Sequence, residues 1–164
     1  MQEKKVTFRI QPGGTFRGEA RVPGDKSISH RSIMLGAIAE GTTRVTGFLE
    51  AEDCLSTMKA FKAMGVTIEG PNEGVVVIHG VGLHGLQPPA APLDLGNSGT
   101  SIRLLSGLLA GQKFDTVLTG DASLSKRPMR RVTDPLRLMG AVIETTETGT
   151  SPLKIEGGRT LKGI

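Results

Sequence analysis

The chain has 164 residues, of which 37% are hydrophobic, and a formal net charge of +4. This length corresponds to one ordinary domain with enough apolar side chains for a core. The basic charge would suit nucleic acid, but the sequence has no Trp, no Tyr and five Phe, so it lacks the stacking surfaces of a single-strand binder. No apolar run approaches the roughly 20 residues of a membrane helix, and Met1–Lys5 lacks the apolar stretch of a signal peptide. We therefore expect a cytoplasmic protein that binds neither nucleic acid nor a membrane.

Residues 1–22 have the pattern of a lead-in to the rest of the chain. Apolar and polar residues alternate over Val6–Ile10 and again over Arg17–Val22. The turn Gln11–Gly14, with the sequence Gln-Pro-Gly-Gly, separates the two runs. This pattern predicts two short strands joined by a turn.

Residues 23–87 have the pattern of one α/β module. Pro23 and Gly24 precede a helix that Ser27 or Ser29 can cap, and this helix is apolar on several faces, which predicts that it is buried. Cys54, the single cysteine, excludes an internal disulfide and a cysteine-based zinc site, and it falls in a second, amphipathic helix. The expected order is a helix ending near Glu40, a strand over 42–48, a helix over 52–64, and strands over 66–69 and 75–79.

A second module, residues 93–158, follows the proline-rich linker 88–92 and repeats the first. The pattern of Gly24–Arg31 recurs in Gly96–Arg103, which indicates a duplicated structural unit. Each module has one apolar and one amphipathic helix, so we expect the apolar helices to lie parallel at the centre, with the sheets outside. The expected elements are a helix over 101–110, a strand over 116–119, a helix over 129–139, and strands over 142–145 and 153–156.

The two repeated turns have the composition of an anion site. Each places hydroxyls, backbone N–H groups and a cation at the start of a helix, where the helix dipole favours negative charge. A nucleotide P-loop is excluded because Asp25, not glycine, precedes Lys26. The residues expected to bind anions are the cations Lys26, Arg31 and Arg127, the neutral donors Ser27, Asn97 and Thr100, and Gly99, which lets a ligand approach the backbone.

A structural interpretation of the same residues stays open. Arg31 and Arg103 could serve as capping or salt-bridging residues, although duplication of the whole pattern favours anion binding. His30 has no carboxylate nearby in the sequence to orient it, which favours a hydrogen-bonded structural role. No general base emerges, because the carboxylates near helix ends and in loops are interpreted as caps and solvated charges: Glu40, Glu50, Glu52, Asp53 and Asp121.

Three motifs together resemble the 5-enolpyruvylshikimate-3-phosphate synthase family: Pro23–Arg31, Leu95–Arg103 and Gly120–Met129. They fall in the family's order and spacing, and the resemblance covers the whole chain. It implies the α/β fold of the enolpyruvyl transferases, an inside-out barrel of repeated βαββαβ modules with buried parallel helices and outer sheets. The implied reaction transfers the enolpyruvyl group of phosphoenolpyruvate to the 5-hydroxyl of shikimate 3-phosphate, releases phosphate, and uses no metal or cofactor.

The resemblance also implies a role for each residue of the anion site. Lys26 would be catalytic and contact both substrates. Ser27 and Arg31 would contact shikimate 3-phosphate. The residues implied for the phosphoenolpyruvate site are Asn97, Gly99 and Arg127, followed by Thr100 in the turn linked to glyphosate sensitivity and by Arg103 as a supporting residue.

Members of this family are more than twice as long, with two domains of three modules each. By this resemblance, residues 1–22 would belong to the second domain, and residues 23–164 would be an incomplete N-terminal substrate-binding domain with two of its three modules. The implied partner is the remaining C-terminal part of the enzyme, and we expect the chain alone to be inactive. Two alternatives stay open: an enolpyruvyl transferase acting on UDP-N-acetylglucosamine, whose expected cysteine is missing from residues 121–127, and a non-catalytic anion-binding module.

Overall fold

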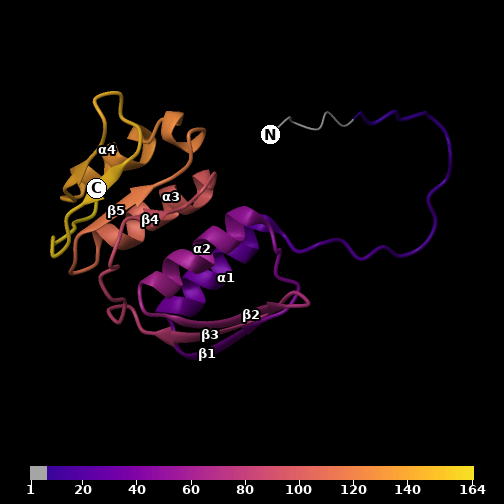
Figure 1. The fold of residues 1–164 in the computed structure, drawn as a ribbon, viewed down its shortest axis with the longest axis horizontal. Coiled ribbons are helices and arrows are strands. Elements are labelled where there is room, and N and C mark those ends of the chain that lie inside the picture. Colours follow the sequence, from indigo (N-terminus) through magenta and orange to yellow (C-terminus); the bar gives the residue numbers. More distant parts are fainter. Residues whose placement is uncertain (1–6) are drawn as a thin grey trace.

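The computed structural model describes residues 7–164, which form two α/β modules side by side (Figure 1). The first module contains an antiparallel sheet with the strand order β1-β3-β2, and the helices lie on one face of it. Its elements are α1 (Lys26–Ile38), β1 (Glu40–Val45), α2 (Glu52–Ala63), β2 (Thr67–Asn72) and β3 (Val75–Val81).

The second module has a four-stranded sheet in the order β4-β5-β7-β6, in which only β4 and β5 are parallel. After β4, the order helix, strand, helix, strand, strand is the one expected from the residues. The complete order βαβαββ differs from the βαββαβ modules implied by the resemblance in the place of the second helix. Its elements are β4 (Leu93–Asp94), α3 (Gly99–Ala110), β5 (Thr116–Thr119), the short 3-10 helix η1 (Leu124–Lys126), α4 (Arg130–Leu138), β6 (Ile143–Glu144) and β7 (Leu153–Ile155).

The internal repeat is present in the sheets as well as in the sequence. In the first module β3 pairs antiparallel with β1 and β2, and in the second β7 pairs antiparallel with β5 and β6. The second module adds β4 beside β5, whereas β1 pairs only with β3 within residues 7–164. The duplicated unit predicted from the sequence is thus confirmed, although the first module has no counterpart of β4 among the described residues.

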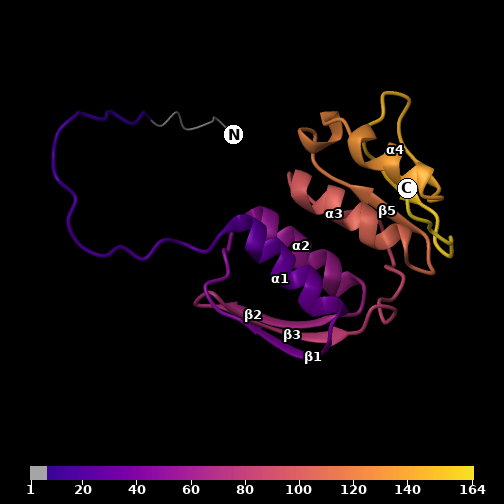
Figure 2. The ribbon, with the colours of Figure 1, turned by 180° about the vertical axis from the view of Figure 1, so that it is seen from behind.

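The expected lead-in strands are wrong for the described residues. Residues 7–22 contain no helix or strand, and they extend away from the two modules in both ribbon views (Figures 1 and 2). Their large apolar side chains are exposed; Phe8, for example, is 86% exposed. A strand is stable only when a neighbour takes up its backbone hydrogen bonds, and no segment of residues 23–164 pairs with this one. Val6, the first residue of the expected strands, lies outside the described residues.

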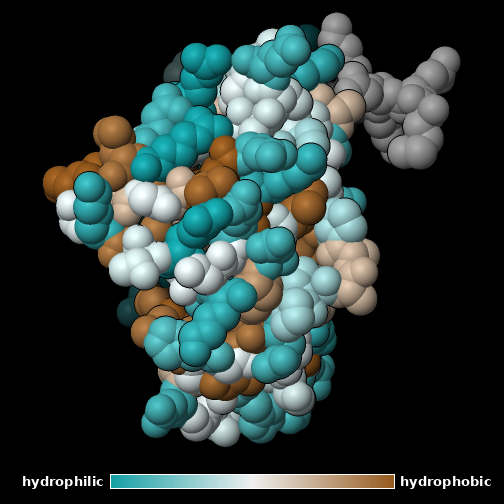
Figure 3. All heavy atoms as spheres, turned by 90° about the vertical axis from the view of Figure 1, so that its left-hand side faces the viewer, coloured by the Kyte–Doolittle hydropathy of each residue, from teal (hydrophilic) through white to brown (hydrophobic). Residues whose placement is uncertain are grey.

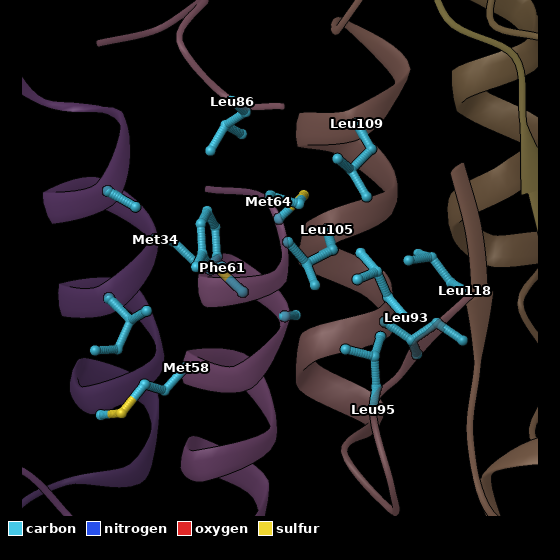
Figure 4. Packing of buried hydrophobic residues seen from close by; sticks show 14 of the residues in the cluster. Met34, Met58, Phe61, Met64, Leu86, Leu93, Leu95, Leu105, Leu109 and Leu118 are labelled. Carbon is cyan, nitrogen blue, oxygen red and sulfur yellow. The ribbon is translucent and has the colours of Figure 1, made fainter. Parts of the chain in front are cut away.

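The core lies where α1, α2, α3 and the two sheets meet. Phe61 of α2 and Met64 at the C-terminal end of this helix are fully buried and extend into the space between the flanking helices, close to Met34 of α1 and Leu105 of α3 (Figure 4). Burying a side chain of this size stabilises the fold by about 1.5–3 kcal/mol. The amphipathic α2 therefore connects the two modules.

The expectation that α1 is buried all round is wrong. Its inner residues Ile33 and Ala37 are inaccessible, but Leu35 is 63% exposed and Ile28 is 68% exposed. Leu35 lines an open apolar groove together with Leu104 and Leu108 of α3. Elsewhere apolar residues are more dispersed: on the face that carries α4, Figure 3 shows brown patches separated by hydrophilic residues. Among residues 7–164, no helix is long and apolar enough to cross a membrane.

Candidate active site

The N-terminal ends of α1, α2 and α3 lie together at one end of the molecule. The Lys26 ammonium at the start of α1 donates a 2.8 Å hydrogen bond to the carboxylate of Asp53 at the start of α2. One turn deeper, the Thr57 hydroxyl of α2 lies 2.6 Å from the Ser101 hydroxyl near the start of α3. The two repeated turns therefore come together, as the sequence predicts.

The turn before α1 depends on a glycine with no room for a side chain. A Cβ atom on Gly24 would lie 1.9 Å from the backbone oxygen of Gly47, so any side chain would displace the backbone. Asp25 caps the helix by accepting a 2.7 Å hydrogen bond from the Ile28 N–H. The expected cap by Ser27 or Ser29 is therefore wrong: the buried Ser29 hydroxyl instead donates to the Asp25 carbonyl and accepts from the Leu49 N–H.

Lys26 carries the first charge of the site and faces solvent. Its hydrogen bond to Asp53, and the negative charge of that carboxylate, raise the pKa of Lys26, while the positive charge of Arg127 opposes this shift. The interpretation of Asp53 as a cap or solvated charge missed this ion pair, because the partners are 27 positions apart in the chain.

Ser27 and Arg31 occupy the exposed side of the first turns of α1. The guanidinium of Arg31 donates a 3.1 Å hydrogen bond to the Ser27 carbonyl, so the two residues are held one helical turn apart on one surface. Arg31 forms no ion pair with any carboxylate of residues 7–164. The alternative that Arg31 is a salt-bridging residue is therefore wrong for the described residues.

The second turn places Gly99 directly against two guanidinium groups. A Cβ atom there would lie 2.7 Å from Nη1 of Arg103 and 2.8 Å from Nη1 of Arg127. Ser98 caps α3 through the Ser101 N–H, so the helix begins at Gly99, two residues before the expected start. Thr100 follows on the first turn and is half-buried.

Three arginines lie around this turn: Arg103, Arg127 and Arg131. Arg103 donates to the Gly99 carbonyl at 2.9 Å, and burial together with the positive charges of Arg131 and Arg127 lowers the pKa of Arg103. None of the three arginines forms an ion pair within residues 7–164. Adjacent cations that form no ion pair, of which Arg103 and Arg127 are partly buried, create a positive potential that favours an anionic ligand.

A three-residue chain of hydrogen bonds joins this turn to the loop of residues 120–128. The Asn97 side-chain amide donates to the Asp121 carboxylate at 2.8 Å, and the guanidinium of Arg127 donates to the Asn97 side-chain oxygen. The other Asp121 oxygen accepts from the backbone N–H groups of Ser123 and Leu124. These hydrogen bonds, the one from Asn97 first, lower the pKa of Asp121. Asp121 thus accepts N–H groups at the start of η1, whose N-cap residue is Ser123, and its contact with Asn97 was not anticipated.

His30 is completely buried beneath the site. Its Nδ1 atom lies 2.7 Å from the Thr57 hydroxyl, and burial lowers the pKa of the ring, with a smaller contribution from the charges of Lys26 and Arg31. The Ser98 and Ser101 hydroxyls, 2.5 Å apart, extend the same network into α3. The predicted hydrogen-bonded structural role of His30 is confirmed, whereas the serine and threonine partners were not anticipated.

The arrangement supplies cations and hydrogen-bond donors, and two of its carboxylates are already engaged. Asp53 is paired with Lys26, and both oxygens of Asp121 already accept hydrogen bonds. Among the described residues, no three side chains of His, Cys, Asp or Glu are grouped so that they could hold a metal ion. The site can therefore bind and position an anion.

Comparison with known proteins agrees with the motifs. The sequence profile of EPSP synthase (3-phosphoshikimate 1-carboxyvinyltransferase) matches residues 10–164. A 3-phosphoshikimate 1-carboxyvinyltransferase from Methylococcus capsulatus is 74% identical over the whole chain, which covers 38% of that protein. One from Alkalilimnicola ehrlichii is 68% identical over 97% of the chain, which covers 36% of that protein. The chain thus spans well under half the length of these relatives.

Solved structures give the same result. The EPSP synthase of Acinetobacter baumannii superposes with a TM-score of 0.88 at 70% identity, over 90% of this chain and 33% of that one. The enolpyruvyl transferase NikO of Streptomyces tendae is only 17% identical, with a TM-score of 0.52 over 84% of this chain and 31% of that one, so it supports the fold alone. These matches confirm the α/β fold of the enolpyruvyl transferases expected from the sequence. On the profile match and on these identities, the chain belongs to the EPSP synthase family.

Proposed function

We propose that this chain forms one wall of the substrate site of a 3-phosphoshikimate 1-carboxyvinyltransferase. The complete enzyme would transfer the enolpyruvyl group of phosphoenolpyruvate to the 5-hydroxyl of shikimate 3-phosphate and release phosphate. The observation that carries this proposal is the cluster of cations at the starts of α1 and α3, in which Arg103 and Arg127 pack against Gly99 and form no ion pair among the described residues. Two polyanions can be held next to each other only where cations offset their mutual repulsion.

The positions of the cations support a division of labour between the two turns. Arg31 and Ser27 lie on the exposed surface of α1 and would bind shikimate 3-phosphate. Asn97, Gly99 and Arg127 surround the second turn and would bind phosphoenolpyruvate, with Arg103 in support and Thr100 next to Gly99. Lys26 lies at the start of α1 and its pKa responds to the charge of Arg127, so it would contact both substrates.

Proton transfer would come from outside these residues. The reaction needs a group that removes the proton of the attacking hydroxyl and one that protonates the methylene carbon of phosphoenolpyruvate. Neither Asp53 nor Asp121 is free to do so. We therefore expect that residues 1–164 alone bind anions without turnover, and that the remaining part of the enzyme, as partner, completes the site. The lone cysteine Cys54 fits the reducing cytoplasm as the location.

A chimeric enzyme tests this function. Residues 1–164 would replace the 164 residues that they match in the Methylococcus capsulatus relative. We expect phosphate release that requires both phosphoenolpyruvate and shikimate 3-phosphate. Lys26→Ala should reduce kcat/KM at least tenfold, because a charge-assisted contact is worth about 1.5–3 kcal/mol. Lys62→Ala, which removes an exposed lysine at the far end of α2, is the matched control.

Two results would contradict the proposal. One is a folded chimera that does not turn over phosphoenolpyruvate with shikimate 3-phosphate, or that accepts UDP-N-acetylglucosamine in place of shikimate 3-phosphate. The other is a Lys26→Ala variant that behaves like Lys62→Ala.

A further inference from the structure

Asp121 is an exposed loop residue whose backbone and carboxylate both contact the turn of the candidate site that precedes α3. Its backbone N–H donates to the Gly96 carbonyl at 2.9 Å, which ties the loop of residues 120–128 to the turn that precedes α3. One carboxylate oxygen accepts the backbone N–H groups of Ser123 and Leu124. The other accepts the side-chain amide of Asn97 at 2.8 Å.

The contact with Asn97 determines which way that amide faces. A carboxylate with its proton removed can only accept hydrogen bonds, so the NH₂ group of Asn97 must point toward Asp121. The oxygen of the same amide then points the other way, where it accepts the hydrogen bond from the Arg127 guanidinium. With the amide reversed, an NH₂ group would face the guanidinium, and two donors cannot bond each other.

We propose that Asp121 is a positioning residue that fixes the orientation of Asn97 and thereby holds the Arg127 guanidinium in place for the incoming phosphoenolpyruvate anion. This inference rests on the proposed function of the site. A planar guanidinium binds an anion well only when its fork is correctly aimed, so preorganisation by a neutral oxygen raises affinity without neutralising the charge. Asp121 lies at one remove from the ligand and acts through Asn97.

The substitution Asp121→Asn separates this role from simple capping. Asparagine has the same shape, and its oxygen can still accept the Ser123 and Leu124 N–H groups. Its NH₂ group, however, would face the NH₂ group of Asn97 and force that amide to reverse. If Asp121 is only a cap, Asp121→Asn is nearly neutral and Asp121→Ala is harmful. If Asp121 orients Asn97, Asp121→Asn is at least as harmful as Asp121→Ala.

We would measure KM for each substrate in the chimera described above. The expected result for Asp121→Asn is an increase of about tenfold in KM for phosphoenolpyruvate, which is the effect of weakening one charge-assisted contact, with KM for shikimate 3-phosphate within about twofold of the parent. Asp115→Asn is the matched control, because Asp115 also accepts a backbone N–H, that of Gly157, but away from Arg127. Unchanged KM values in Asp121→Asn, with a harmful Asp121→Ala, would overturn the proposal.

A second measurement needs no turnover. In a sample labelled with ¹⁵N-arginine, a hydrogen-bonded guanidinium shows slow rotation of its NH₂ groups, and Arg127→Lys identifies the Arg127 signal by its loss. We expect slow rotation at Arg127 in the parent and in Asp115→Asn, and fast rotation in Asp121→Asn. Equal rotation in all three proteins would overturn the positioning role. If slow rotation is lost only in Asp121→Asn but the chimera has no transferase activity, the positioning role is supported and only the proposed function is contradicted.

Discussion

A single methyl group at Gly99 should weaken phosphoenolpyruvate binding without weakening the fold. In Gly99→Ala the new Cβ would lie 2.7 Å from Nη1 of Arg103 and 2.8 Å from Nη1 of Arg127. Ordinary contact begins near 3.4 Å, so both guanidinium groups must retreat by about 0.6–0.7 Å. Because these are the ends of flexible side chains, they can move, but they then leave the place where they meet the anion.

The magnitude follows from the contacts that are disturbed. Losing a charge-assisted hydrogen bond completely costs about 1.5–3 kcal/mol. A displacement that weakens two such bonds without abolishing them should therefore raise KM for phosphoenolpyruvate by about tenfold, equivalent to about 1.4 kcal/mol. Alanine also favours a helix over glycine by about 1 kcal/mol, so the melting temperature should stay the same or rise.

Gly107→Ala is the matched control for this substitution. Gly107 lies on the same helix, α3, and a Cβ atom there would meet nothing within 4 Å. It should gain the same helix propensity and leave both KM values unchanged. Steady-state kinetics of the two variants in the chimera, together with thermal unfolding, provide the comparison. If Gly99→Ala leaves KM for phosphoenolpyruvate at the value of Gly107→Ala, the guanidinium groups at Gly99 do not bind that substrate.

Arg127→Ala should weaken binding of phosphoenolpyruvate more than that of shikimate 3-phosphate, and Arg31→Ala should do the reverse. Arg127→Lys should recover only part of the loss, because an ammonium lacks the planar fork of a guanidinium. Equal losses of affinity for both substrates in titrations of both alanine variants would refute this division. Gly24→Ala should destabilise the protein by at least 1–3 kcal/mol, about the cost of overpacking, since its Cβ would meet the Gly47 oxygen at 1.9 Å; an unchanged denaturation midpoint would contradict the tight turn. His30 has a folded-state pKa below its ordinary value of 6.5, so the unfolded chain binds more protons and stability should fall as the pH drops below about 6.5. The decline should be smaller in His30→Asn. Identical pH profiles of the melting temperature in the two proteins would show that His30 is not the source of the decline.

Much of the fold follows from local sequence patterns. The strand over 116–119 forms at the predicted residues, and α2 ends within one residue of its predicted limits. The repeat of the two turns correctly predicts that the starts of α1 and α3 lie together. These features depend on hydrophobic periodicity, caps and glycine turns, which act over a few residues and can therefore be read directly from the chain.

The errors have a common cause in missing or distant neighbours. The alternating pattern of residues 7–22 is that of a strand, but a strand forms only against a partner, and none of residues 23–164 supplies one. The composition of α1 suggested burial on all sides, but a helix face is buried only where another element covers it, and Leu35 is uncovered in the described residues. Neither fact can be read from the local sequence.

The sequence by itself determined the chemical character of the site: two glycine turns at helix starts, with lysine, arginine and neutral donors. Tertiary structure alone decided how these groups are held. Asp53 pairs with Lys26 and Asp121 orients toward Asn97 across 27 and 24 positions of the chain, and the packing of Gly99 against Arg103 and Arg127 joins separate elements. A carboxylate looks the same in sequence whether it faces solvent or a neighbour, because its role depends on which charged or polar group the fold places within about 3 Å of it.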